Sequence, residues 1–440
     1  MLTTTLAFAF VIGVLVFVHE LGHFLAARRI GIKVLTFSLG FGPKLLKFHR
    51  GDTEYCVSAI PLGGYVKMAG ENPDDERTGS PEEFMSRTKW ERFQVLIMGP
   101  VMNIVLAVVV MTLVLYQGAE MPAYEEEPPV VGTVVEGSEA ERVGIEIGER
   151  IVSVEGKPTD TWGDLFVQIM PRADRALLVE VRDQAGSTRT IRMTPDSQTE
   201  FEVGDLGVGP LVEPQVLAVS PGEPADIAGV QSDDVIEALD GKHVSSQDLI
   251  KRINASAGQS IRLTVRRGES RHDLDVVPAL VGDVGLIGVS ISPFVVRIVE
   301  PGFVEAFQLS LEKNYEWSGL IFQTLVGLVT AETSPKQLVG PVGIAQLSGS
   351  YAELGLVALF SFLSMLSLNL GILNLLPVPV LDGGHIVIMA LEGVSRRDFS
   401  MRMKERMLLV GFVLLMMLMV TVVYNDLTRI AWIERLMPWR

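Results

Sequence analysis

Four long hydrophobic regions flank a more polar middle part of the chain. We expect these regions to be membrane spans, at residues 1–27, 95–117, 354–391 and 407–424. A helix needs about 20 apolar residues to cross a bilayer, and the third region is too long for one straight helix. It also contains two prolines and two glycines between residues 377 and 384. We therefore expect the third span to be a helix that breaks partway through the membrane.

The polar middle part contains a duplicated unit, at residues 128–212 and 213–293. A shift of 85 residues superimposes the two copies, with the matched pairs Ala140 and Ala225, Gly144 and Gly229, Ile151 and Ile236, Gly156 and Gly241, and Lys157 and Lys242. A repeat of this length is one small domain rather than a solenoid unit. The pattern resembles PDZ domains, which bind an extended peptide or a chain terminus by strand addition. The alternative is that the two domains are passive spacers.

Two further segments lie beside the spans. In the loop at residues 28–94, residues 53–67 alternate between apolar and polar side chains, which predicts strands and a β-hairpin at residues 35–68. The plain alternative is an ordinary cytoplasmic hairpin. Residues 303–330 are apolar but carry several charges, so we expect an interfacial amphipathic helix rather than a fifth span. The expected fold is a multi-pass α-helical membrane protein with four spans, this hairpin and two tandem α+β PDZ-like domains.

Charge indicates how the spans are oriented. Residues 21–51 contain six basic side chains and no acidic one, and the loop between the third and fourth spans contains five more, at Arg396, Arg397, Arg402, Lys404 and Arg406. By the positive-inside rule, both loops face the cytoplasm. The start of the middle part is acidic, which places the two repeats and both termini on the opposite side.

The overall composition narrows the class of protein. The chain has 440 residues, of which 48% are hydrophobic and 20% charged, as expected for several spans with a soluble insert. The formal net charge of −16 argues against nucleic-acid binding. A single cysteine, Cys56, excludes an intrachain disulfide and any cysteine-based metal site.

The most informative motif is His19-Glu20-Leu21-Gly22-His23, at the end of a first span with no charged residue between Leu2 and Val18. On a helix, His19 and His23 lie one turn apart on one face, where both can bind one Zn²⁺, and Glu20 can accept a proton from a water. Ionisable groups within a span are costly and usually functional. The span also lacks a small-residue cleavage site, so we interpret it as retained rather than as a signal peptide.

A zinc site of this type needs a third protein ligand. Asp382 follows the two prolines of the third span and precedes its two glycines, a setting that lets its carboxylate turn toward a neighbouring helix. His385 is the competing candidate, and a simple helix-capping Asp382 is the structural alternative.

These motifs together resemble the site-2 protease family, the M50 intramembrane zinc metalloproteases, in its bacterial form with two PDZ domains. The segments that carry the resemblance are His19–His23, Gly40–Pro43, Ile60–Lys67, Gly99–Asn103, Gly340–Val342 and Asn374–Gly383. The resemblance implies that His19, His23 and Asp382 bind one Zn²⁺ per chain and that Glu20 is the general base. It also implies that Asn374, Pro377 and Pro379 hold the substrate beside the metal, and that the hairpin dips into the membrane.

The family resemblance also implies a substrate and a compartment. The substrate would be a single-span membrane protein, of the anti-sigma factor type, after a first external cut, and signal-peptide remnants are a second class. The enzyme would lie in the bacterial inner membrane, with the repeats and both termini in the periplasm. The repeats would act as a size filter or as a receptor for the new chain terminus.

Two readings from other classes compete with this one. A membrane scaffold without protease activity could present the two repeats, although the intact motif His19–His23 argues against it. An aspartyl intramembrane protease would need two aspartates within spans, and Asp382 is the one that the pattern supports.

Overall fold

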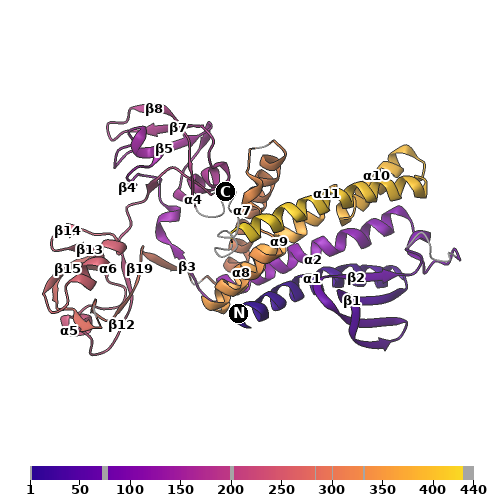
Figure 1. Cartoon of the computed structure of the whole chain (residues 1–440), viewed down its shortest axis with the longest axis horizontal. Coiled ribbons are helices and arrows are strands. Elements are labelled where there is room, and N and C mark those ends of the chain that lie inside the picture. The colour runs from indigo at the N-terminus through magenta and orange to yellow at the C-terminus, as the bar shows by residue number, and fades with distance from the viewer. Residues whose placement is uncertain are drawn as a thin grey trace. The chain divides into compact units, whose positions relative to one another are not determined.

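The structure is a computed structural model that describes residues 2–71, 78–198, 203–282, 284–299, 301–330 and 332–429. The chain divides into two compact units, the first formed by residues 1–117 and 300–440 and the second by residues 118–299. Figure 1 shows the long helices of the first unit and the small sheets of the second.

The first unit is mainly helical. Its elements are α1 (Leu2–Ile30), β1 (Val34–Arg50), β2 (Thr53–Met68), α2 (Lys89–Tyr116), α7 (Phe303–Val329), α8 (Pro341–Glu353), α9 (Leu356–Asn374), α10 (Asp382–Ser395) and α11 (Met401–Thr428). In the part of the chain that the structure describes, four helices are long and apolar enough to cross a membrane, namely α1, α2, α9 and α11. This number agrees with the four expected spans.

Several helix boundaries differ from the expected limits of the spans, and two of these differences have a clear local reason. α2 begins six residues before the expected 95, because Thr88 and Glu91 form a capping box: Glu91 N donates to Thr88 Oγ1, and Thr88 N donates to Glu91 Oε2. The third hydrophobic region, 354–391, forms two helices, and α9 ends at Asn374 before α10 begins at Asp382. The break therefore occupies residues 375–381, the segment that contains both prolines.

α9 and α2 pack closely through small and polar side chains. Ser367 Oγ donates to Asn103 O over 2.7 Å, and Ser364 Oγ donates to Ala107 O over 2.8 Å. Gly371 completes the contact, since a Cβ there would lie 3.0 Å from Pro100 O. Interhelical hydrogen bonds and small residues are the usual means by which spans associate in lipid.

The expected hairpin is present, and its two strands are bent. Residues 36–39 of β1 pair with residues 54–57 and also with residues 64–67 of β2, while residues 44–50 pair with residues 53–58. The two strands therefore form a small sheet of four segments whose outer edges are 44–50 and 64–68. Phe37 anchors this sheet to α1, with its ring centroid 5.5 Å from that of Phe24.

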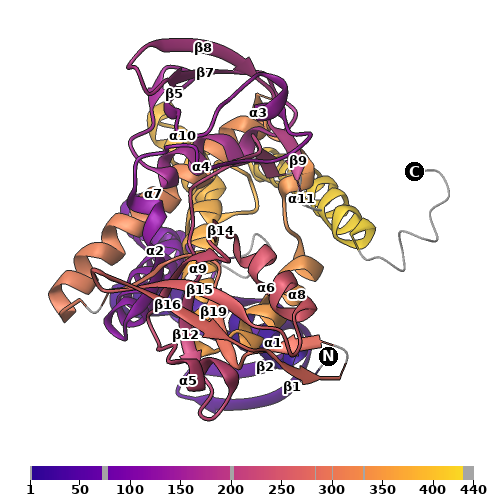
Figure 2. The same ribbon diagram turned by 90° about the vertical axis from the view of Figure 1, so that its left-hand side faces the viewer.

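The helices after the second unit were only partly expected. α7 is one continuous helix over the expected segment 303–330 and lies against α2, where Ser310 Oγ donates to Val108 O over 2.8 Å (Figure 2). α8 was not predicted, because its apolar pattern is weak. Its first turn is tied to α11 by Asp426, whose buried carboxylate accepts hydrogen bonds from Gly340 N and Gly343 N over 3.0 and 2.9 Å.

The second unit contains the two copies of the repeat. Its elements are β3 (Ala119–Pro122), β4 (Thr133–Val134), α3 (Glu139–Arg142), β5 (Arg150–Val154), β6 (Lys157–Pro158), α4 (Trp162–Ile169), β7 (Leu177–Arg182), β8 (Thr188–Met193), β9 (Asp196–Gln198), β10 (Val203–Asp205), β11 (Val208–Gly209), β12 (Gln215–Val219), α5 (Pro224–Ala228), β13 (Val235–Leu239), β14 (Lys242–His243), α6 (Ser246–Ala255), β15 (Ile261–Arg267), β16 (Ser270–Val276), β17 (Ala279–Val281), β18 (Val284–Leu286), β19 (Val289–Ser292) and β20 (Val296–Val299). The main sheets have the orders β6-β5-β7-β8 and β16-β15-β13-β12-β19, the latter with β14 beside β13.

The matched positions of the two copies have the same structural roles. Ala140 and Ala225 are fully buried, and Ile151 and Ile236 lie at the centres of the two separate cores. The matched glycines at positions 144, 156, 229 and 241 all have positive φ, between 73° and 89°. The repeat in sequence therefore reflects two equal sets of core contacts and turns, and in each core one helix, α4 or α6, packs on the sheet.

Candidate metal centre

The two motif histidines lie on the last turns of α1, where that helix touches α2. Glycines make the contact possible: a Cβ at Gly22 would overlap the carbonyl oxygen of Met98, and a Cβ at Gly99 would overlap His23 Nε2. The imidazole rings of His19 and His23 therefore fill the space that a side chain at position 99 would occupy.

Each imidazole is oriented by a hydrogen-bonding partner on α2. His23 Nδ1 lies 2.9 Å from Val95 O, which fixes the proton on Nδ1 and leaves Nε2 free to bind a metal. His19 Nδ1 lies 3.2 Å from the side-chain amide of Asn103, whose buried Oδ1 has no hydrogen-bond partner among the described residues. Turning that amide by 180° lets Oδ1 accept the Nδ1 proton, the arrangement that a metal-binding His19 requires.

Asp382 is the first residue of α10. The capping position, Leu381, makes no side-chain cap, and Asp382 Oδ2 lies 3.2 Å from His19 Nε2, so the carboxylate is directed at α1 rather than used as a helix cap. The structure thus argues against the alternative of a simple capping aspartate.

The two glycines after Asp382 have a different role from the one expected. Neither Gly383 nor Gly384 has a positive φ; instead, a Cβ on either would overlap the backbone of the preceding turn, at Leu375 or Val378. The unusual backbone lies at Val380, with φ of 114°, a conformation that costs a β-branched residue about 1–3 kcal/mol. Close packing, rather than glycine flexibility, therefore sets the position of Asp382.

The three side chains fit one metal ion. His19 Nε2 and His23 Nε2 lie 3.2 Å apart, and Asp382 Oδ2 lies 3.2 and 3.5 Å from them. Ligands about 2.0–2.1 Å from a tetrahedral zinc ion are about 3.4 Å apart, close to all three distances. Two imidazoles and a carboxylate are also a donor set typical of catalytic zinc sites. Among the described residues these three form a group of possible ligands within 4.8 Å.

The other expected site residues lie outside the group of three ligand atoms. Glu20 is buried beside the edge strand of the hairpin, since a Cβ at Gly64 would lie 2.9 Å from Glu20 Cγ. Asn374 ends α9 with its Nδ2 3.5 Å from His19 Nε2, close to the ligand group. Pro377 and Pro379 belong to the break and have no polar contact with the three ligands in the described part of the chain.

Two alternatives are not brought together with the ligands. His385 lies one turn beyond Asp382 and is not part of the group of three ligand atoms among the described residues. A second aspartate within a span helix exists, Asp426, but its carboxylate accepts the backbone hydrogen bonds of α8 instead. The geometry therefore favours the metal site over an aspartyl dyad.

A cavity of about 410 Å³ leads away from Asp382 along one face of α10. Asp382, His385, Met389 and Glu392 line it at intervals of three or four residues, and Arg92 of α2 and Lys404 of α11 lie on its other walls. The cavity therefore connects the ligand group with the end of α10 where the basic loop begins.

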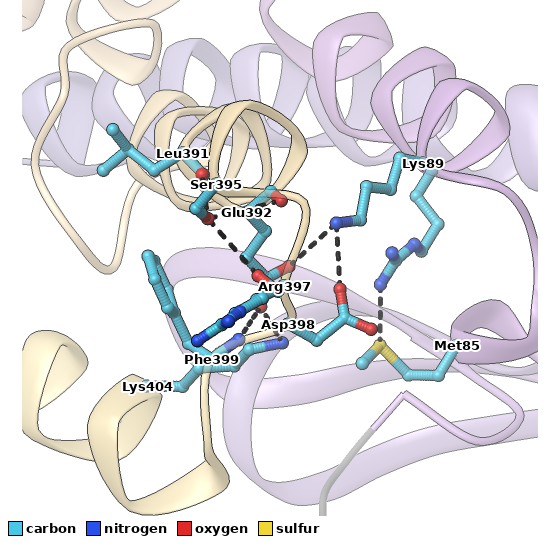
Figure 3. Close-up of polar contacts among 10 residues, drawn as sticks. Met85, Lys89, Leu391, Glu392, Ser395, Arg397, Asp398, Phe399 and Lys404 are labelled. Atoms are coloured by element: carbon cyan, nitrogen blue, oxygen red, sulfur yellow. Dashed lines mark hydrogen bonds and ion pairs between the residues drawn. The ribbon is translucent and has the colours of Figure 1, made fainter.

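At that end of the cavity, the carboxylate of Glu392 is nearly fully buried and joins three elements (Figure 3). Lys404 Nζ lies 2.8 Å from Glu392 Oε1, and Phe399 N donates to the same oxygen over 2.8 Å. Lys89 Nζ of α2 lies 4.0 Å from Glu392 Oε2 and 2.8 Å from Oδ1 of the exposed Asp398. The hydrogen bond from this ammonium group holds the pKa of Asp398 below its usual range.

Comparison with known proteins gives a consistent result. The family model described as "Peptidase family M50" matches residues 7–418. The chain is 35% identical to a Neisseria meningitidis protein named "Putative zinc metalloprotease", over 97% of this chain and 99% of the relative. It is 33% identical to the regulator of sigma-E protease RseP of Escherichia coli and 32% identical to the regulator of sigma E protease of Haemophilus influenzae, each over 96% of this chain and 98% of the relative.

Among solved structures, a PDZ domain of an SdrC-like protein from Listeria innocua is 25% identical over 18% of this chain and 92% of that chain. The TM-score is 0.17, so this likeness has no bearing on the fold of the repeats. The resemblance to the M50 family that the motifs suggested is confirmed by the family model and the relatives.

Proposed function

The chain belongs to peptidase family M50 and is a zinc metalloprotease, and from this premise we propose that it cleaves a peptide bond within the membrane-spanning segment of its substrate. The observation that carries the proposal is the ligand group. His19 and His23 lie on α1, which is long and apolar enough to span a membrane, and Asp382 follows the break after α9, a second such helix. We propose that His19, His23 and Asp382 hold one Zn²⁺ per chain.

The proposed reaction is hydrolysis. A bound Zn²⁺ would act as a Lewis acid on the scissile carbonyl and make a water acidic enough to lose a proton near neutral pH. Glu20, next to His19 on the same helix, takes that proton at its carboxylate and then delivers it to the leaving nitrogen. Its burial beside Gly64 supports this role, because a carboxylate shielded from bulk water passes its proton to the substrate rather than to solvent.

Two parts of the fold are suited to holding an unwound substrate. The amide of Asn374 lies near His19 Nε2 and can bond to a substrate carbonyl or N–H beside the metal. The outer edge of the hairpin, residues 64–68, passes Glu20, and an open strand edge can pair with an extended peptide. Pro377 and Pro379 contribute by keeping the backbone between α9 and α10 out of a helix.

Water has to reach this site from one side of the membrane. The cavity from Asp382 to Glu392 supplies a polar route, and it ends beside the loop that contains Arg396 and Arg397. Under the positive-inside rule that end is cytoplasmic. We therefore propose that water enters from the cytoplasm and that the second unit and both termini lie in the periplasm of a bacterial inner membrane.

The names of two relatives suggest the kind of substrate. Both are named regulator of sigma E protease. We propose that this chain cuts a single-span anti-sigma factor after a first external cut, with signal-peptide remnants as a second class. The two repeats would then act as PDZ domains, either excluding uncut substrate or binding the new terminus.

The test compares purified wild-type protein with Glu20→Gln on a model single-span substrate, with bound zinc measured in both. We expect Glu20→Gln to keep its zinc and to lose cleavage by a factor of about 10² or more, because the proton acceptor is gone while the ligands remain. Equal cleavage by both proteins would remove Glu20 from the mechanism. No cleavage by either, with zinc bound, would favour the scaffold alternative.

A further inference from the structure

The first turns of α11 form one wall of an open groove that is lined neither by the three proposed metal ligands nor by Glu20. Its volume is about 690 Å³, and it is lined by Pro379, Ser400, Arg402, Met403, Arg406, Met407 and Val410. We propose that this groove binds one anionic phospholipid, with the phosphate between the two arginines and an acyl chain along the apolar residues below them.

The charge of the groove favours an anion. Arg402 and Arg406 lie one turn apart on the same face of α11, and no carboxylate lines the groove. In the described part of the chain neither guanidinium has an ion-pair partner, whereas the neighbouring Lys404 pairs with Glu392. Two unpaired guanidinium groups on one face match the planar, bidentate geometry of a phosphodiester.

The start of the helix adds polar donors at the same place. Ser400 precedes α11 but its side chain makes no hydrogen bond to the helix, so its hydroxyl can donate to a phosphate oxygen. The first N–H groups of a helix have no partners within it, and the helix dipole favours an anion there. Ser400 and Arg402 both line the groove, so the start of the helix lies beside the first arginine.

The apolar half of the groove favours a lipid over a free phosphate ion as the occupant. Met403, Met407 and Val410 continue down the same face of α11, and Val410 is 67% exposed. A phosphate ion would leave these side chains without contacts, whereas an acyl chain covers them. A basic pocket at the cytoplasmic end of a span is the usual form of an anionic-lipid site.

The groove also touches the backbone that leads to the metal ligand. Pro379 forms its floor, and α11 packs directly on this residue, since a Cβ at Gly411 would overlap the Pro379 carbonyl oxygen. Three residues later the chain reaches Asp382. A lipid that fills the groove presses on the turn that positions this carboxylate, and on the basis of the proposed function we expect anionic lipid to raise the cleavage rate.

Lipid retention tests the site without reference to proteolysis. The purified full chain is placed in nanodiscs of phosphatidylcholine with and without phosphatidylglycerol, and retained lipid is measured by native mass spectrometry. Arg402→Gln with Arg406→Gln should lower the affinity for phosphatidylglycerol roughly thirtyfold, given the usual contribution of each basic residue. Val410→Trp, which narrows the apolar half and keeps both charges, should also lower it.

The matched control is Arg396→Gln with Arg397→Gln, which removes the same charge from the loop just before α11, outside the groove. It should retain the lipid like the wild type. Equal loss in both double variants would show a diffuse charge effect and overturn the site, as would full retention in the groove variant. Inorganic phosphate at matched ionic strength should not displace the lipid; displacement would indicate a phosphate-ion site instead.

Cleavage in the same nanodiscs separates the two proposals. The wild type could retain phosphatidylglycerol and yet cleave at the same rate in nanodiscs with and without this lipid. That result would support the binding site but contradict the proposed effect on Asp382. If Glu20→Gln were to cleave normally, the proposed mechanism would fail while the lipid measurement remained valid, because it does not depend on catalysis.

Discussion

At the scale of single residues, Gly99 lies where the two imidazoles meet α2. Gly99→Ala should displace His23 Nε2 and the His19 ring, because an added Cβ would overlap the first and lie 2.9 Å from Cε1 of the second. We expect at least about a tenfold loss of zinc affinity, the size of effect seen when ligands are misoriented. The measurement is zinc content after equilibration against a series of chelator concentrations.

The control for this change is Gly13→Ala, on α1, where nothing lies within 4 Å of an added Cβ. This variant should bind zinc as the wild type does. If Gly99→Ala bound zinc equally well, the imidazoles would have room to move, and the close contact with α2 would not determine the site.

The grouping of the three proposed ligands could be predicted at this scale, because the chemistry that marks them is local. His19, Glu20 and His23 follow helical spacing, and Asp382 stands out beside prolines in an apolar region. The contribution of Asn103 was missed, although it is a polar residue in an apolar span, because its partner His19 is 84 residues away in the chain. Contacts of this kind follow from packing, which no spacing rule describes.

At the scale of elements, Glu392 connects α2, α10 and α11 through Lys89 and Lys404. Glu392→Gln should destabilise the protein by about 1.5–3 kcal/mol, because a buried charged acceptor is lost while both ammonium groups remain. Thermal unfolding in detergent measures the change. Asp398→Asn is the control: this partner of Lys89 is exposed, so its loss should cost less than about 1 kcal/mol.

Equal destabilisation by both variants would mean that the burial of Glu392 has no energetic consequence.

The elements themselves were predicted with mixed success. Spans and the hairpin follow from hydrophobic patterning, whereas the start of α2 depends on the capping pair Thr88 and Glu91, and α8 depends on backbone bonds to Asp426. Capping and tertiary hydrogen bonds leave little trace in a hydrophobic profile.

At the scale of the whole molecule, all three proposed ligands belong to the first unit. The chain leaves the first unit after α2 and returns to it at α7. These two places lie close together, since the ring centroids of Tyr116 and Phe303 are 5.9 Å apart. Replacing residues 119–299 with a short Gly/Ser linker should therefore leave one zinc per chain. Metal analysis checks this result, and a chain that failed to bind zinc would show that the first unit does not fold alone.

The same deletion distinguishes the two roles proposed for the repeats. A size filter predicts cleavage of substrate that has not been cut outside the membrane, because nothing then excludes it. A terminus receptor predicts slower cleavage of pre-cut substrate. Adding His23→Ala to the deletion is the control, since it removes a ligand and should abolish either activity.

α11 has 28 residues and is about 42 Å long. It is attached at two depths, by the contact of Gly411 with Pro379 and by the bonds of Asp426 to Gly340 N and Gly343 N. Spans usually adapt to a thinner or thicker bilayer by tilting, and a helix held at two points loses that freedom. The surrounding lipid must stretch or thin instead, so bilayer thickness becomes one of the forces that act on the turn before Asp382.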